Sequence, residues 1–235
     1  TACSSSAKAF GAGARLLDAG WVDAVLVGGV DSLCQTTLYG FHSLELFSPE
    51  ICRPWDAGRR GLSIGEGAAF ALLEREAPAA QGLLLGVGES NDGYHMSSPR
   101  PDGAGAMAAM RQALTSAGLQ ARDIDYINLH GTATPNNDVA EDTSVCGVFG
   151  RATPASSTKG ATGHTLGAAG AVEASISLLV IESGLMPGGL NLREIDPALH
   201  VQYLTASRRG RVHRVLSNSF GFGGSNACLV LGAAA

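Results

Sequence analysis

The sequence predicts an α/β protein whose central sheets are covered by helices on both faces. Two observations predict this class: glycine-bounded apolar runs resemble buried strands, and alanine-rich stretches that end on glycine separate them. Composition agrees. With 45% hydrophobic residues, 16% charged residues and 32 glycines among 235 residues, the chain can bury a sizeable core and is neither disordered nor a coiled coil.

The predicted strands are continuous apolar runs, which is typical of strands buried on both faces. They cover residues 23–29, 67–74, 82–90, 125–132, 214–220 and 226–232. The predicted helices cover residues 5–20, 104–118 and 163–184. Each helix ends on a glycine, which readily adopts the left-handed conformation found there. The polar, proline-containing segment 74–82 predicts a joint between two halves, residues 1–78 and 79–235.

Charge and cysteine content disfavour several classes of protein. The net charge of −5 argues against nucleic acid as a partner. No apolar run is expected to reach the roughly 18 residues of a membrane span. The cysteines are odd in number and form no C-x-x-C pair, so we expect neither disulfides nor structural zinc, and a reduced cytoplasmic compartment fits best. They are Cys3, Cys34, Cys52, Cys146 and Cys228.

Cys3 is the first candidate functional residue. TACSSS precedes an alanine-rich helix, so Cys3 is expected at a turn where unpaired N–H groups and the positive end of the helix dipole favour a thiolate. A nucleophile and an ordinary structural cysteine on a turn are both consistent with this stretch.

His130 lies in NLHGTATP, at the end of a predicted strand. Gly131 allows a sharp turn, Thr132 and Thr134 place hydroxyls nearby, and Pro135 is suited to begin a helix. We interpret this stretch as a loop that delivers an imidazole to a site, although a single histidine is more often structural.

His164 is expected at the head of the predicted helix 163–184, where the dipole would keep its imidazole neutral. A neutral imidazole can donate a hydrogen bond to a developing oxyanion. Glycines at three- and four-residue spacing would give this helix a face without bulk. Zinc held by Cys3, His130 and His164 is formally possible, but the spacing is not that of a metal motif.

NSFGFGGSNA, residues 218–227, links two predicted strands through a glycine-rich turn. It is either a plain hairpin or a turn whose N–H groups form half of an oxyanion hole, with a phenylalanine beside it as a hydrophobic gate.

These stretches resemble the 3-oxoacyl-[acyl-carrier-protein] synthases, the elongating condensing enzymes of the thiolase fold. The matching motifs, in order, are TACSSS, PWDAGRRGLSIGEGAA, NDGYHMSSP, HGTATPNND, SSTKGATGHTLGAAGAVEA and NSFGFGGSNA. The resemblance covers essentially the whole chain. It implies a thiolase-like layered α-β-α-β-α architecture with much of the first half missing, so we expect the sequence to be a C-terminal portion that can be inactive alone.

The resemblance also implies the roles of the central residues. Cys3 would accept an acyl group from the phosphopantetheine thioester of acyl carrier protein. His130 and His164 would then hold the enolate formed when malonyl-carrier loses carbon dioxide. The N–H groups of Cys3 and Phe222 would form the oxyanion hole, with Phe222 as the gate and Phe220 beside it.

Supporting roles and partners follow from the same resemblance. Lys159 would pair with Glu173 or Asp138 to orient the histidines, and Thr132 and Thr134 would bind the pantetheine arm. No metal or other cofactor is expected. Acyl carrier protein is the implied partner, and the assembly is expected to be a homodimer, with a heterodimer as the alternative. The basic segment 207–214 would either contact the acidic carrier or serve as a solvated connection.

Two alternatives to fatty-acid elongation remain open. Arg60 and Leu62 stand where the family usually has aspartate and phenylalanine, and Ser225 where threonine is usual. These departures lean slightly toward a polyketide or polyene ketosynthase with the same chemistry. The other alternative is a non-catalytic partner subunit of a heterodimer, which retention of Cys3 and both histidines disfavours.

Overall fold

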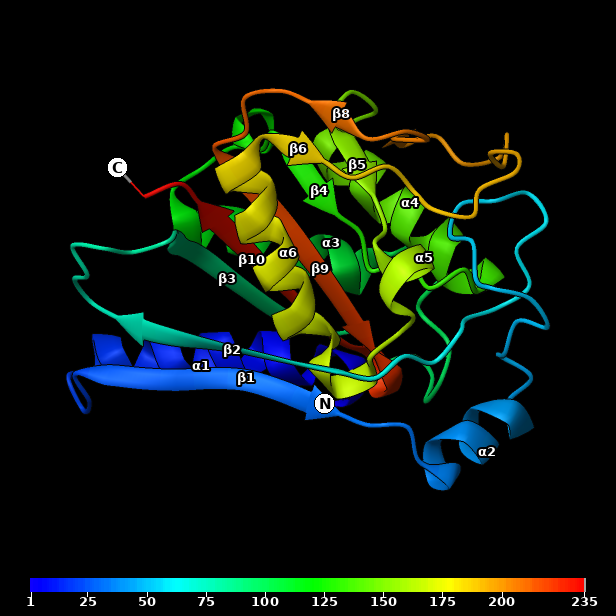
Figure 1. Cartoon of the computed structure of the whole chain (residues 1–235), viewed down its shortest axis with the longest axis horizontal. Coiled ribbons are helices and arrows are strands. Elements are labelled where there is room, and N and C mark those ends of the chain that lie inside the picture. The colour runs from blue at the N-terminus through cyan, green and yellow to red at the C-terminus, as the bar shows by residue number, and fades with distance from the viewer. Residues whose placement is uncertain (235) are drawn as a thin grey trace.

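Two sheets of unequal size enclose a layer of helices, as the computed structural model of residues 1–234 shows (Figure 1). The smaller sheet pairs β1 (Ala24–Asp31) antiparallel with β2 (Gly67–Glu74). Helices α1 (Ser5–Asp18) and α6 (Ala169–Ser183) contact this sheet on one side and strands of the larger sheet on the other. The layers therefore run sheet, helix, sheet and helix. The outer face of the smaller sheet is exposed, so the predicted strands 23–29 and 67–74 are buried on one face and not on both; Leu26, Val30, Phe70 and Leu72 are 59–71% exposed.

The larger sheet is mixed, because β3, β10 and β9 are antiparallel neighbours whereas β9, β4, β5 and β7 are parallel neighbours. In spatial order its strands are β3 (Leu83–Asn91), β10 (Ser225–Gly232), β9 (Arg214–Gly221), β4 (Tyr126–Asn128), β5 (Pro154–Ser156) and β7 (Gln202–Tyr203). Helices α3 (Ala104–Ala117) and α4 (Pro135–Phe149) form the remaining layer behind it (Figure 1).

β10 explains why continuous apolar runs form strands here. Cys228 and Val230 belong to the hydrophobic cluster under α3, whereas Ala227, Leu229 and Leu231 belong to the cluster under α1 and α6. Side chains alternate between the faces of a strand, so a strand with a helix layer on each side must be apolar at every position.

The short elements connect these layers. They are α2 (Gln35–Ser43), α5 (Lys159–Thr162), β6 (Leu185–Met186), β8 (Arg208–Arg209) and the 3₁₀ turns Ala2–Ser4, Ala121–Asp123, Leu166–Ala168 and Phe222–Gly224. β6 and β8 pair with each other as a separate ribbon.

The predicted helix 163–184 is wrong over its first residues. α5 ends at Thr162, the next residue (Gly163) has a φ of 66°, and α6 begins only at Ala169. Between them His164 is held like a strand residue: its N–H donates to the Ser63 carbonyl at 2.7 Å and its carbonyl accepts from Gly65 N–H at 3.0 Å. His164 is therefore fixed by a neighbouring segment and does not begin a helix.

The remaining predicted elements are found, with small shifts of their ends. The exception is the predicted strand 125–132, of which only Tyr126–Asn128 is strand.

One helical stretch, Leu166–Ser183, has the length and composition of a membrane span, with a mean hydropathy of 1.4. The expectation that no stretch would qualify is therefore wrong. Half of this stretch is buried inside the protein, so its hydropathy is weak evidence for a span.

Candidate active site

Cys3 lies in the 3₁₀ turn that leads directly into α1. Ala2 takes a left-handed conformation with φ of 48°, and the Ser4 hydroxyl donates to the Thr1 carbonyl at 2.8 Å. This tight turn places the Cys3 side chain, which is only 5% exposed, on the wall of a cavity of about 230 Å³.

Burial raises the pKa of the Cys3 thiol to about 11, against the expectation of a stabilised thiolate. Lys159 and the N–H groups of Phe222 and Cys3 act in the opposite direction, but removal from water outweighs them. The structure therefore presents a protonated thiol, and the same two N–H groups face its sulfur, where the resemblance places the oxyanion hole.

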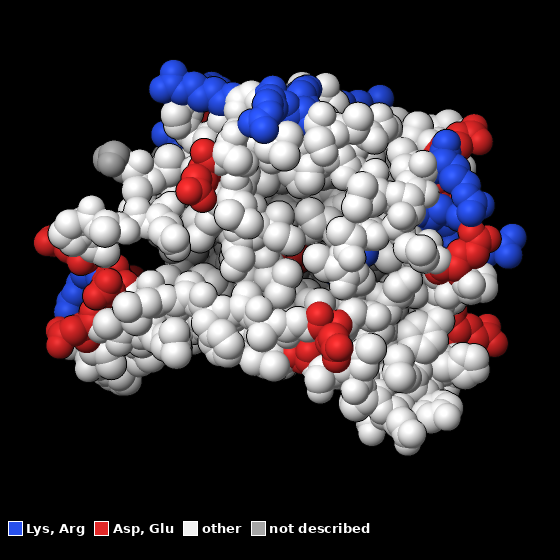
Figure 2. Space-filling model, viewed as in Figure 1, with Lys and Arg blue, Asp and Glu red and all other residues white. Residues whose placement is uncertain are grey.

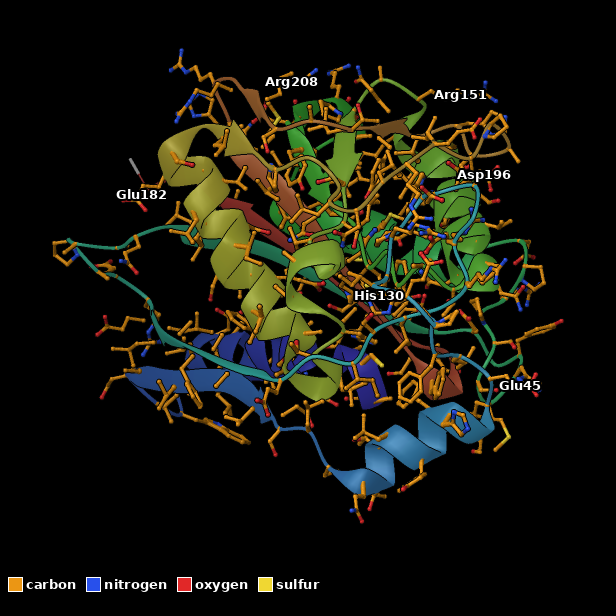
Figure 3. All side chains as sticks on the ribbon, turned by 45° about the vertical axis from the view of Figure 1, so that its right-hand side comes forward. Glu45, His130, Arg151, Glu182, Asp196 and Arg208 are labelled. Atoms are coloured by element: carbon orange, nitrogen blue, oxygen red, sulfur yellow. The ribbon has the colours of Figure 1, made fainter. Side chains whose placement is uncertain are left out.

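His130 and His164 meet at the same cavity, with ring centroids 5.2 Å apart and planes at 85°. His130 lies at the centre of the view in Figure 3. Burial and the positive charge of Lys159 hold the pKa of both imidazoles well below its usual range. Both rings are therefore neutral, as predicted for His164, but burial rather than a helix dipole is the main cause.

Lys159 is buried behind the histidines and forms an ion pair with Glu173. Its ammonium group also donates to the His130 carbonyl at 2.6 Å and lies 3.4 Å from His130 Nδ1. Of the two partners expected for Lys159, Glu173 is the one in contact with it. Lys159 makes no such contact with Asp138.

Asp138 instead accepts hydrogen bonds from the N–H groups of Trp55 and Ala133, with Arg59 Nε 3.5 Å from its carboxylate. Because Ala133 lies between Thr132 and Thr134, Asp138 fixes the loop after β4 and not the lysine. Burial raises the pKa of Asp138 to about 6.

Glu141 was missed by the sequence analysis. Its carboxylate accepts the N–H groups of His130 and Gly131 at 2.8 and 2.7 Å, and the Asn218 amide at 3.0 Å. It therefore holds the main chain that delivers His130, and burial raises its pKa to about 7. Its one sequence signal is its place two turns into the helix that Pro135 begins.

The cavity walls differ in character. Thr132 and Thr134 line it with hydroxyls 2.8 Å apart, and these hydroxyls form the polar part of the wall. Phe41, Leu46 and Leu62 supply apolar surface. Phe41 lies in α2 and Leu46 lies just after it. The contribution of this helix to the cavity was not predicted from the sequence.

The loop 221–224 closes the cavity beside Cys3. A Cβ atom on Gly221 would lie 2.7 Å from the Thr1 carbonyl oxygen and 3.1 Å from Cys3 N, so glycine permits the close approach of this loop to the cysteine turn. Phe222 stacks on Phe41 with ring centroids 5.4 Å apart, and Phe220 lies 5.8 Å from His130. Both phenylalanines line the cavity.

A buried thiol, two neutral imidazoles and two main-chain N–H groups around one cavity define the class of site. Such a set can form and break a thioester and can stabilise an enolate. Within residues 1–234, no group of metal-ligating side chains is placed to hold an ion.

Comparison with known proteins identifies the family. Residues 1–79 match the family model "Beta-ketoacyl synthase, N-terminal domain" and residues 81–193 match "Beta-ketoacyl synthase, C-terminal domain". The 3-oxoacyl-[acyl-carrier-protein] synthase 2 of Rhizobium meliloti is 41% identical over an alignment 253 positions long, which covers 98% of this chain and 59% of that protein.

Two solved structures share the fold. The ketosynthase ApeO from Xenorhabdus doucetiae, solved in complex with its chain length factor ApeC, matches with a TM-score of 0.96 and 48% identity, covering 100% of this chain and 59% of that one. A beta-ketoacyl synthase from Burkholderia phymatum matches with a TM-score of 0.95 and 36% identity, covering 100% and 60%.

The chain belongs to the beta-ketoacyl synthase family and has its thiolase-like fold. It spans between 54% and 60% of the length of the curated relatives it matches.

Proposed function

We propose that this chain carries the catalytic centre of a 3-oxoacyl-[acyl-carrier-protein] synthase, an acyltransferase that joins a Cys3-bound acyl group to malonyl-acyl carrier protein. The observation that carries this proposal is the convergence of Cys3, His130 and His164 on one cavity. Family membership and the names of the relatives support it.

In the first step the Cys3 sulfur attacks the carbonyl carbon of an acyl thioester. Because the resting thiol is protonated, its proton must leave as the new bond forms, and a neutral imidazole of the pair can accept it. The N–H groups of Cys3 and Phe222 hold the oxyanion. As the tetrahedral intermediate collapses, the bond to the carrier sulfur breaks and the imidazolium gives its proton to that sulfur, which leaves acyl-Cys3, a carrier thiol and two neutral histidines.

In the second step the carbon–carbon bond to the malonyl carboxylate breaks and carbon dioxide leaves. The electron pair moves onto the malonyl thioester oxygen, where two imidazole N–H groups can donate to it. The carbanion carbon then attacks the acyl carbonyl and expels the Cys3 thiolate. Neutral histidines suit this step because each keeps one N–H group, which can donate a hydrogen bond to the enolate oxygen without giving up its proton.

Mass spectrometry tests the proposal. The chain is incubated with an acyl-carrier thioester, its intact mass is read, and the modified residue is mapped by digestion. We expect one acyl group on Cys3, none in Cys3→Ser, and unchanged acylation in the control Cys34→Ser. A fusion that adds the upstream part of the Rhizobium relative is run in parallel. Absence of acyl-Cys3 in both proteins contradicts the proposal and favours the non-catalytic partner subunit.

A ketosynthase of a polyketide or polyene pathway is the second candidate. The identity to the Xenorhabdus ketosynthase, 48%, supports it, and Leu62, a departure from the family pattern, lines the cavity. Profiling with saturated and conjugated acyl-carriers separates the two, because an enzyme of fatty-acid synthesis should accept saturated chains broadly. Acyl carrier protein as partner, pairing with a second copy or a chain length factor, and a cytoplasmic location belong to the same proposal.

A further inference from the structure

The ribbon of β6 and β8 carries a concentrated positive charge that the proposed reaction does not use. We call Arg208, Arg209, Arg211 and Arg214 the arginine strip. The first three are exposed and Arg214 is half-buried. Lysine and arginine side chains lie along the upper edge of the molecule in Figure 2, over β8. This edge is basic although the whole chain has a net charge of −5.

The strip is not neutralised by its surroundings. Across residues 1–234, no carboxylate lies within 4.0 Å of any of its guanidinium nitrogens. Asp125 approaches this segment, but its Oδ2 accepts the N–H groups of His213 and Arg214 at 2.7 and 2.9 Å. Main-chain pairing holds the ribbon itself, and Arg209 also donates from Nη1 to the Ser183 carbonyl at the end of α6, at 3.4 Å.

The strip also lies far from the cavity. Arg214 begins β9, and Phe220 and Gly221 at the other end of the same strand line the cavity. Seven residue steps of about 3.3 Å place roughly 23 Å between the two ends. A carrier protein docked on the strip would therefore be badly placed to deliver its thioester, which disfavours the interpretation of segment 207–214 as the carrier contact.

The neighbourhood of the strip indicates the kind of polyanion. Leu185 pairs with Arg209 across the ribbon and is 37% exposed, and Leu179, four residues before the last residue of α6, is 59% exposed. Segment 205–214 contains no phenylalanine, tyrosine or tryptophan on which nucleic-acid bases could stack. The strip lines neither the active-site cavity nor the smaller cavity beside it.

We propose that the arginine strip is a docking surface for the anionic headgroups of a phospholipid membrane. Arginines on an exposed edge, with Leu185 beside them, are suited to a broad charged surface: the guanidinium groups contact phosphates and the leucine reaches the headgroup region. The chain would then act at a membrane surface, with its cavity facing away from the lipid.

Co-sedimentation with vesicles tests this proposal. We expect the chain to bind vesicles that contain phosphatidylglycerol and not vesicles of phosphatidylcholine alone. Binding should weaken from 0.1 to 1 M salt, as the Debye length falls from about 10 to about 3 Å. Arg208→Glu with Arg209→Glu should weaken binding at least tenfold.

The matched control is Arg60→Glu with Arg75→Glu, which changes the net charge equally at exposed positions elsewhere. Arg208→Lys with Arg209→Lys preserves charge and should keep binding, which separates the docking role from a folding defect. Equal losses in the strip variant and the control overturn the proposal. So does strip-dependent binding to soluble polyglutamate or RNA without binding to vesicles.

Discussion

Lys159 donates a hydrogen bond of 2.6 Å to the main-chain oxygen of His130. The same ammonium group pairs with Glu173 and lies near the His130 ring, so one buried cation sets both the position and the charge of the imidazole. The pKa of His130 is low because burial and this neighbour both oppose protonation.

Replacing Lys159 by methionine should destabilise the protein and raise the pKa of His130. Glu173 would remain buried without its partner, and breaking a buried pair from one side typically costs about 3–5 kcal/mol. Urea denaturation measures this change and histidine NMR titration follows the pKa. The double variant Lys159→Met, Glu173→Gln should recover part of the lost stability; equal stabilities of the single and double variants would contradict the ion-pair role.

Alkylation should modify Cys34 before Cys3 at pH 7. Burial raises the pKa of Cys3 to about 11, so only about one molecule in ten thousand carries a thiolate there at pH 7. The pKa of exposed Cys34 is lowered by hydrogen bonds from Thr37. Iodoacetamide labelling with peptide mapping should show the Cys3 rate rising tenfold per pH unit from 7 to 10. Preferential labelling of Cys3 at pH 7 would show that the resting cysteine is a thiolate.

Stability should fall as pH rises from about 4.5 to 7, in part because of Glu141. Its folded pKa, about 7, exceeds the ordinary value of 4.5, so the folded state binds the proton more tightly. This contribution is complete below pH 4.5 and is lost as pH rises through 7, up to about 3 kcal/mol. Denaturation of Glu141→Gln should show a smaller change over this range. An unchanged pH slope in the variant would rule Glu141 out as its source.

Gly221→Ala should slow acylation of Cys3 about a hundredfold, because its Cβ would push the Phe222 loop away from the cysteine turn. The matched control is Gly40→Ala in α2, where a Cβ meets nothing within 4 Å. Rates come from intact mass against time. Equal rates in both variants would exclude the 221–224 loop from the oxyanion hole.

The residues that share the cavity could be predicted because their signals are local. Cys3 precedes a helix, and His130 and His164 each lie in a short motif rich in glycine and threonine. β9 and β10 could be predicted for a similar reason, since burial on both faces leaves a continuous apolar run. β1 and β2 are also continuous apolar runs, although only one face of their sheet is covered. β5 and β7 are too short to leave such a pattern.

The rest depends on contacts between distant segments. The role of Glu141 could not be predicted, because only the fold brings its carboxylate in helix α4 against the main-chain N–H of His130. The segment 63–65 holds His164 extended where the alanine-rich stretch suggested a helix. The pKa of Cys3 could not be predicted from its turn, because the helix end is visible in the sequence whereas the extent of burial is not.

β10 contributes to both hydrophobic clusters, and this limits how the sequence can change. Inserting one residue early in β10 would exchange the side chains that face α3 with those that face α1 and α6. Both clusters would lose their packing at the same time, so neither cluster could keep the protein folded while the other is disrupted. We expect such an insertion in β10 to be far less tolerated than one in the segment 74–82, which forms the connection between β2 and β3.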